Sequence, residues 1–347
     1  MHLMTMSGRI WTWAVAACFG ALLACADPAA AAVVTNLYEA SVPAGGRGDA
    51  ARNAAFAAAL RIVAVRASGQ RDAGDRLSAA TLADARRFVQ RFGDNPDGTL
   101  QVGFDGASID RILAQNGLPV WGRERPLTLV WLSIEEAGGQ QTWVGVGTVV
   151  PETRLAQQVA DLRGLPLAWP AMDMEDRMLA NVLDGDQAGI RLATLASRYR
   201  ADGVLVGRAR RAATGELSVR WSLHAGETVQ ETVGSLPEGI HFAADQLART
   251  YAAAAGAVQD VVVDVAAIND LQAYAETLNY LEGLTLVTAA AVEQVSGDTV
   301  RFRLQVRGDA ALLARAIRLG ARLVPDQTAA DAGNRLTLRY QPAGAIR

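Results

Sequence analysis

Beyond the N-terminal region the sequence contains two histidines, His224 and His241, which are the side chains best suited to acid–base or metal chemistry. Asp245 follows His241 by four residues, so a helix would place the imidazole and the carboxylate on one face. A zinc site needs three or four protein ligands, and neither a cysteine nor a third histidine accompanies this pair. We therefore expect no metal, and a hydrolase that uses His224 or His241 remains an alternative that lacks a Gly-x-Ser-x-Gly motif.

Other residue patterns argue against cofactor chemistry. The chain has no lysine, which excludes Schiff-base catalysis and the lysine of a Walker-type phosphate loop. The apolar run 204–206 precedes Gly207, but the glycine fingerprint of a dinucleotide-binding turn is missing. The acids between residues 173 and 176 are explained by their position at a helix start. We expect no cofactor and no catalytic residue, and hence a non-enzymatic protein.

The N-terminus predicts export. Arg9 precedes an apolar run over residues 10–26, and the alanines at 30–32 form a small-residue cleavage site. Cleavage after Ala32 would remove a signal peptide, residues 1–32, and with it both cysteines of the chain. The mature protein would then have no disulfide and no thiol nucleophile. The expected location is the periplasm.

A second interpretation of this segment is an outer-membrane lipoprotein. Leu22-Leu23-Ala24-Cys25 resembles the lipobox of bacterial lipoproteins, in which the cysteine is lipidated. Cys25 would then anchor the protein, and only in that case would a membrane be a partner. The formal net charge of −3 is close to neutral, which excludes the strongly basic surface typical of nucleic-acid binding.

The mature chain is predicted to be an α+β protein of three small α/β modules. The first covers residues 33–150, with a strand at 38–42, a helix from Asp49 to Gly69 and a strand pair between 127 and 149. Asp49 is predicted to cap its helix. Trp121 lies in this module close in sequence to two further tryptophans, and it is a candidate for a partner surface, although core packing is the commoner role of such aromatics.

Several segments of this chain resemble a known family. They are Leu37-Tyr38-Glu39-Ala40 with Val42-Pro43, residues 49–69, Gly117-Leu118-Pro119-Val120-Trp121-Gly122, and Arg125-Pro126 with Val130-Trp131-Leu132. They are similar to the exported bacterial family known as domain of unknown function number two thousand and sixty-six. That resemblance implies no activity, cofactor or catalytic residue.

The central module is predicted over residues 151–256. A helix with Leu192, Leu195 and Tyr199 on one face is followed by Gly203, which we expect to end it, and then by a buried strand at 204–206. This alternation is loosely similar to the α/β domains of envelope-assembly proteins, such as penicillin-binding-protein activators and the N-terminal domain of the Tol-system propeller protein. Those domains bind other proteins.

The third module, residues 257–347, is predicted to be ferredoxin-like, with the order β-α-β-β-α-β. Apolar residues at 300, 302, 304 and 306 alternate with polar ones, so one face of this strand meets the core and the other meets water. If neighbouring strands carry them, four arginines would line the solvent face: Arg301, Arg303, Arg335 and Arg339. We interpret this face as a candidate surface for an anionic partner.

The resulting hypothesis is an exported, non-enzymatic periplasmic binding protein or envelope-assembly accessory protein, whose partner is another envelope protein. The alternatives are the periplasmic hydrolase and the lipoprotein described above.

Overall fold

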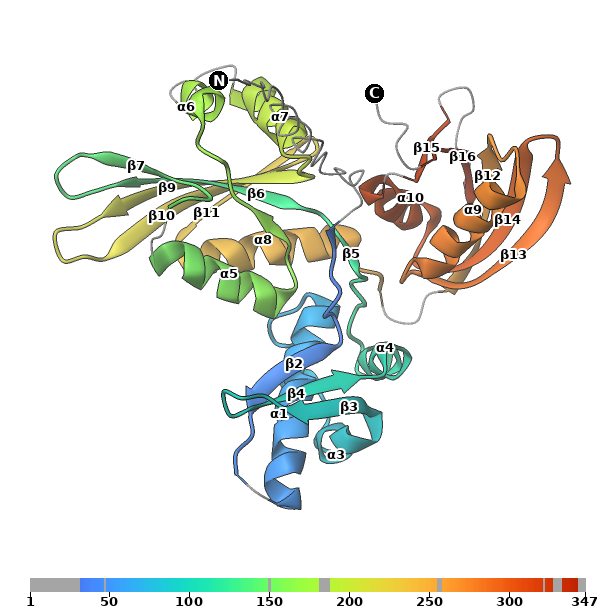
Figure 1. Ribbon diagram of the computed structural model, residues 1–347, viewed down its shortest axis with the longest axis horizontal. Helices are drawn as coiled ribbons and strands as arrows, with labels where there is room; N and C mark the ends of the chain where they lie inside the picture. The colour runs from blue at the N-terminus through green and yellow to red at the C-terminus, as the bar shows by residue number, and fades with distance from the viewer. Residues whose placement is uncertain are drawn as a thin grey trace, which may run out of the picture.

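The computed structural model describes residues 32–46, 48–148, 151–180, 188–254, 258–320, 322–326 and 333–342. The chain is a mixed α+β protein of three small modules, each with its own sheet and helices (Figure 1), which confirms the predicted fold class. Apart from Ala32, the predicted signal segment and Cys25 lie outside the described residues. Within the described ranges, none of the helices combines the length and the apolar character needed to span a bilayer.

The N-terminal module packs helices on a three-stranded antiparallel sheet of order β2-β4-β3 (Glu39–Pro43, Thr99–Phe104, Val89–Asp94). Its long helix, α1 (Asp49–Ser68), buries Phe56, Leu60 and Val63 in the module's core, the face predicted from their spacing. Gly48 occupies the N-cap position and Asp49 is the first helical residue, which corrects the predicted cap by one residue. The remaining helices are α2 (Ala73–Arg76), α3 (Ala79–Ala83), η1 (Ala85–Phe88) and α4 (Gly106–Gln115).

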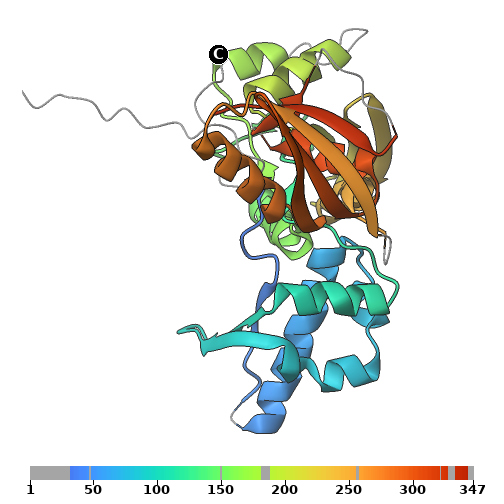
Figure 2. The same cartoon turned by 90° about the vertical axis from the view of Figure 1, so that its right-hand side faces the viewer.

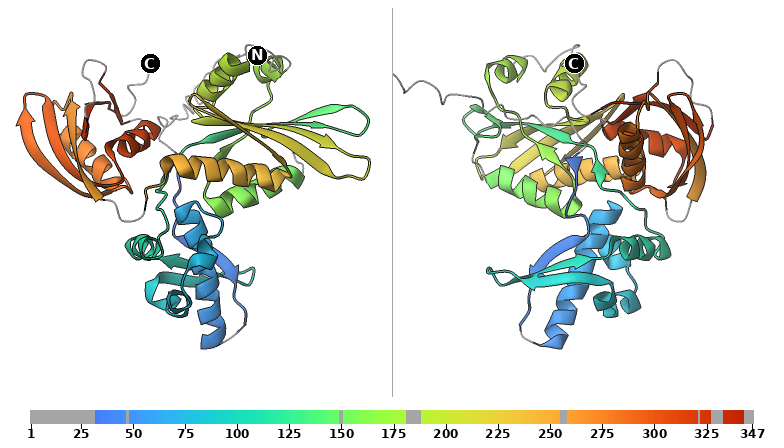
Figure 3. Two further views of the ribbon diagram at one scale, coloured as in Figure 1. Left: turned by 180° about the vertical axis from the view of Figure 1, so that it is seen from behind. Right: turned by 45° about the vertical axis from the view of Figure 1, so that its right-hand side comes forward.

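The central module is built on a sheet of order β11-β10-β9-β6-β7, with the short β8 beside β6. Its strands are β6 (Thr128–Glu135), β7 (Gln141–Val144), β8 (Leu167–Ala168), β9 (Gly203–Arg211), β10 (Leu217–Ala225) and β11 (Thr228–Gly234). Helices α5 (Pro151–Arg163) and α8 (Leu236–Tyr251) cover one face of this sheet, and α6 (Met174–Ala180) and α7 (Ala188–Arg198) lie on the other (Figures 1 and 3).

This sheet differs from the predicted module boundary at residue 150. The strand pair β6–β7, which we assigned to the first module, belongs to the central sheet, where β6 runs parallel to β9 from Thr128 opposite Gly203 to Glu135 opposite Arg210. The physical reason is the composition of β6. Its residues from Thr128 to Ile134 are all buried, so it needs helices on both faces, and only the central module provides them.

The C-terminal module has a five-stranded sheet of order β13-β14-β12-β16-β15. Its elements are β12 (Val258–Ala266), α9 (Leu271–Gly283), β13 (Val287–Ser296), β14 (Thr299–Arg307), α10 (Ala310–Leu319), β15 (Leu323–Pro325) and β16 (Arg335–Tyr340). Strand β14 lies between β12 and β13, so the split β-α-β unit of the predicted arrangement is present.

Two strands, β15 and β16, follow α10, whereas the predicted β-α-β-β-α-β order has one strand there. After α10 the chain forms β15 at the sheet edge and then turns back, so that β16 occupies the place next to β12 and runs parallel to it. Both helices pack on one face, whose core includes Val263, Phe302 and Leu338. The opposite face of the sheet, called here the outer face, is directed away from the other two modules (Figures 1 and 2).

Polar contacts join the N-terminal module to the C-terminal module. Arg307 of β14 donates to the carboxylate of Asp110 on α4 at 2.5 Å, and the Tyr38 hydroxyl donates to the same carboxylate at 3.0 Å. The backbone N–H of Thr285 donates to Glu124 of β5 (Glu124–Arg125), which pairs with β1 (Ala32–Val33). Because Asp110 is almost fully buried, these bonds are shielded from solvent and tie the first module to the third.

Candidate functional site

Trp121 and Arg125 lie at the junction of the N-terminal and central modules. Both side chains are completely buried, and the guanidinium of Arg125 stacks over the Trp121 ring at 3.7 Å from its centroid. Trp121 is therefore not available as a partner surface, which corrects that prediction. The reason is its backbone: Trp121 N–H donates to the Ala67 carbonyl at 2.7 Å, so the end of α1 holds the tryptophan between the modules.

The buried cation of Arg125 is stabilised by main-chain carbonyls of the described residues. Its nitrogens donate to five main-chain carbonyls, those of Arg66, Trp121, Gly122, Arg163 and Gly164, at 2.6–3.3 Å. Three of these carbonyls, those of Arg66, Arg163 and Gly164, are at the C-terminal ends of α1 and α5, where the helix dipole is negative. Burial lowers the pKa of Arg125, yet a guanidinium stays protonated. Arg125 thus joins two helix ends from different modules.

Arg163, also fully buried, explains the role of His241 and Asp245. Its Nη2 donates to the Gly69 carbonyl at 2.7 Å and to Asp245 at 2.5 Å, and its Nη1 lies 3.0 Å from Nδ1 of His241. A guanidinium can only donate, so Nδ1 of His241 is the acceptor and the imidazole is neutral. Burial, together with Arg71 and Arg163, lowers the pKa of His241. His241 and Asp245 therefore lie on one face of α8, as their spacing predicted, and both side chains contact Arg163.

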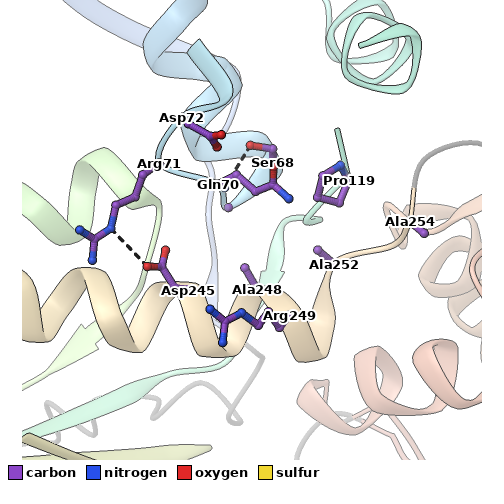
Figure 4. Close-up of a pocket in the computed structure, with 11 residues that line it drawn as sticks. Ser68, Gln70, Arg71, Asp72, Pro119, Asp245, Ala248, Arg249, Ala252 and Ala254 are labelled. Carbon is purple, nitrogen blue, oxygen red and sulfur yellow. Dashed lines mark hydrogen bonds and ion pairs between the residues drawn. The ribbon is translucent and has the colours of Figure 1, made fainter. Parts of the chain in front are cut away.

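A cavity of about 510 Å³ adjoins this junction (Figure 4). It lies between the turn that follows α1 and the C-terminal half of α8. Arg71 pairs with Asp245 at 3.2 Å at this cavity, and Ala248 of α8 contributes to its lining together with Ala252 and Ala254, which follow the helix. In the described part of the chain, no group of three or more histidine, cysteine, aspartate or glutamate side chains could hold a metal ion.

His224 lies on the face of the central sheet that carries α6 and α7. Its Nε2 is 3.0 Å from the Ser222 hydroxyl, and Glu231 faces Ser222 across the β10–β11 pair. Burial lowers the pKa of His224, whereas Glu231 acts in the opposite direction. A hydroxyl hydrogen-bonded to a neutral imidazole is the first half of a nucleophilic triad, and the second half is a carboxylate bonded to the other ring nitrogen.

The outer face of the C-terminal sheet carries the four predicted arginines, two on β14 and two on β16, and β12 lies between these strands. Asp264 of β12 lies between two of them: it accepts from Nε of Arg301 and from Nε of Arg335, both at 2.7 Å. Burial opposes ionisation of this carboxyl, but the bonds from Arg301 and Arg335 lower the pKa of Asp264. Asp264 is 5 % exposed and is ionised at neutral pH.

The other two arginines are paired as well. Arg303 bonds Glu293 at 2.5 Å with Asp260 at 3.9 Å, and Arg339 bonds Asp326 at 3.2 Å. Carboxylates therefore accompany all four arginines, and the face as a whole is not the basic surface that the arginines alone suggested. The excess of positive charge is local, where Arg301 and Arg335 share one carboxylate.

Sequence patterns did not identify the buried arginines Arg66, Arg125 and Arg163. Each lies in or beside a helix end or a short strand, where arginine is normally exposed. Asp264, in contrast, had a signal: it occupies an outward position of an alternating strand, four residues after Asp260. Its pairing with two arginines depends on the order of the strands in the sheet.

Comparison with protein families corrects the resemblance drawn from the sequence. The family model that matches is Domain of unknown function (DUF8605), over residues 31–122, and not domain of unknown function number two thousand and sixty-six. The match spans the N-terminal module and ends at Gly122, just before Arg125. The shared segments 37–40, 49–69 and 117–122 all lie within it. No curated protein matches the chain.

Among solved structures, a competence-damaged protein (CinA) superfamily protein from Escherichia coli is similar to part of the chain. The identity is 11 %, the match covers 41 % of this chain and 84 % of that one, and the TM-score is 0.20. A TM-score this low supports no argument about fold or function.

Proposed function

We propose that this protein is an exported, non-catalytic binding protein of the bacterial cell envelope, located in the periplasm, and that its C-terminal sheet contacts another envelope protein. The observation that carries the proposal is the outer face of this sheet. α9 and α10 pack on the other face, leaving Arg301, Arg303 and Arg335 with their acids directed away from the molecule. Interleaved charges of both signs are typical of surfaces that select a partner by complementarity.

The buried junction between the modules supports this interpretation. Arg125 and Arg163 are completely buried, and their bonds run to main-chain carbonyls and to His241 and Asp245. The ionisable side chains at this junction are thus hydrogen-bonded within the contact between modules. The predicted signal segment supports a location in the periplasm. The α/β alternation of the central module, which is loosely similar to envelope-assembly domains, supports a role in the envelope.

Site-specific photocrosslinking in living cells tests the contact. A photoreactive amino acid replaces Gln305, which is exposed on the outer face of β14, and in a matched variant it replaces Gln90, exposed on β3 of the N-terminal module. We expect one discrete crosslinked product with an envelope protein from position 305 and not from position 90. Equal products from both positions, or none from 305 under conditions in which the protein accumulates, would contradict the proposal.

Fractionation tests the location. A chain processed after Ala32 would be released with the soluble periplasmic fraction, whereas a lipoprotein would sediment with the outer membrane and be released by Cys25→Ser. Retention of the full-length chain in the cytoplasm would refute export itself.

One observation favours a second candidate function, the periplasmic hydrolase. The Ser222 hydroxyl and His224 Nε2 lie 3.0 Å apart, with Glu231 on the neighbouring strand. If this pair is catalytic, the purified protein will hydrolyse p-nitrophenyl acetate, and Ser222→Ala will abolish the activity while His241→Ala retains it. Equal rates for the wild type and Ser222→Ala would remove this candidate.

A further inference from the structure

A depression of about 280 Å³ lies in the outer face of the C-terminal sheet, beside the β13–β14 hairpin. The strands β12, β13, β14 and β16 contribute to it side by side. Its lining consists of Asp264, Gln294, Ser296, Thr299, Arg301 and Arg335. Apart from one carboxylate, these side chains are hydroxyl, amide and guanidinium groups, and all of those groups can donate hydrogen bonds.

The charge of this depression is unbalanced. Two guanidiniums face one carboxylate, and in the described ranges Asp264 is the acid that contacts them. Arg301 and Arg335 each bond Asp264 through Nε and Nη2, and their Nη1 groups have no hydrogen-bond partner among the described residues. The site therefore retains one positive charge and several unused N–H donors.

Asp264 also fixes the positions of these donors. It is 5 % exposed and bonds both guanidiniums, so their planes are held in place before any ligand arrives. Fixing the donors in advance reduces the side-chain entropy that is lost on binding. Carboxylates and phosphates both accept two bonds from the fork of N–H groups on arginine, and a carboxylate carries a single charge.

We propose that this depression binds an aspartate or glutamate side chain from an acidic, extended segment of the partner polypeptide. The inference rests on the proposed binding function and names the chemistry of the partner. One carboxylate would neutralise the excess charge of Arg301 and Arg335, whereas a phosphate dianion would overcompensate it. Gln294 and Ser296 belong to β13, the edge strand of the sheet, so an extended segment along that edge has direct access to the depression.

Titration of the purified protein with defined probes tests this inference, with binding followed by calorimetry or NMR shifts. The probes are a blocked peptide of alternating threonine and glutamate, its counterpart with glutamine in place of glutamate, and inorganic phosphate. We expect the glutamate peptide to bind, and the glutamine peptide to bind at least about tenfold more weakly, because it makes no charge-assisted bonds. Equal affinity for the two peptides, or tighter binding of phosphate than of the glutamate peptide, would overturn the proposal.

Variants locate the binding. Arg301→Gln and Arg335→Gln should each weaken binding of the glutamate peptide about tenfold. Arg303→Gln is the matched control, because Arg303 lies on the same face but outside the depression, and it should change the affinity less than about twofold. Unchanged affinity in the Arg301→Gln and Arg335→Gln double variant would refute the site.

Asp264→Asn separates a binding site from a structural ion pair. Asparagine removes the negative charge but keeps an amide oxygen that can accept from a guanidinium, so the folded variant should bind the glutamate peptide at least as tightly as the wild type. Binding more than about tenfold weaker would contradict the proposal. If Asp264→Asn does not fold, the arginine variants decide the question. Failure of all peptide binding while position 305 still crosslinks would refute this inference and leave the proposed function standing.

Discussion

The guanidinium of Arg125 stacks on the indole ring of Trp121, 3.7 Å from its centroid, and both side chains are completely buried between two modules. The five carbonyls around Arg125 come from the ends of α1 and α5 and from the turn at Trp121 and Gly122. Replacing this cation by an apolar side chain would leave these carbonyls without donors in a site from which water is excluded.

Arg125→Met should lower the free energy of unfolding by at least about 3 kcal/mol, because it removes several charge-assisted bonds and leaves buried acceptors unpaired. Chemical denaturation monitored by tryptophan fluorescence measures the change. Arg87→Gln, at an exposed ion pair with Asp84, is the control and should stay within about 0.5 kcal/mol of the wild type. A loss below about 1 kcal/mol in Arg125→Met would show that the junction is hydrated.

Acidification should destabilise the protein through His241. Its pKa is lowered in the folded state by burial and by Arg71 and Arg163, so the unfolded chain binds the proton at a higher pH. The stabilisation is fully present above the unfolded value of about 6.5 and falls as the pH decreases from there towards the folded pKa. Denaturation at several pH values between about 7 and 5 should give a shallower decline for His241→Asn than for the wild type.

The same denaturation series should be measured on His224→Asn. Burial lowers the pKa of His224 too, so its replacement should remove a separate part of the same decline. Identical pH dependence of the wild type and both variants would mean that partial burial does not lower the pKa of either imidazole in the folded protein.

Substitution of two helical glycines by alanine should change the free energy of unfolding in opposite directions. A Cβ at Gly239 of α8 would lie 2.1 Å from the Trp221 ring, whereas a Cβ at Gly189 of α7 would meet no atom within 4 Å. Gly239→Ala should cost about 1–3 kcal/mol through overpacking, and Gly189→Ala should stabilise by about 0.5–1 kcal/mol through helix propensity. Thermal denaturation distinguishes the two, and a neutral Gly239→Ala would show that Trp221 can move aside.

Asp110 and Arg307 should be energetically coupled across the interface of the first and third modules. They are joined by a bond of 2.5 Å, and the Asp110 side chain is 8 % exposed. A double-mutant cycle of Asp110→Asn and Arg307→Gln should give a coupling of about 1–3 kcal/mol in the free energy of unfolding. Strictly additive losses would show that this contact does not hold the modules together.

Local patterns predicted the elements of this protein well. The alternation at 300–306 predicted which side chains of β14 enter the core, and the spacing of Phe56, Leu60 and Val63 predicted the buried face of α1. These predictions succeeded because helix and strand periods act over a few residues. The end of α7 is an exception: we expected Gly203 to end this helix, but α7 ends at Arg198, Arg200 takes the left-handed conformation with φ 51°, and Gly203 begins β9.

Sequence patterns thus determined the α+β class, the buried faces and the outward direction of Arg301, all of which depend on the order of neighbouring residues along the chain. The tertiary structure was needed to show that β6 and β7 complete the central sheet, that Trp121 is enclosed, and that Arg301 and Arg335 share Asp264. These contacts join residues far apart in sequence, as between Arg163 and Asp245. No local period encodes such pairings, because they follow from the order of strands and the packing of helix ends.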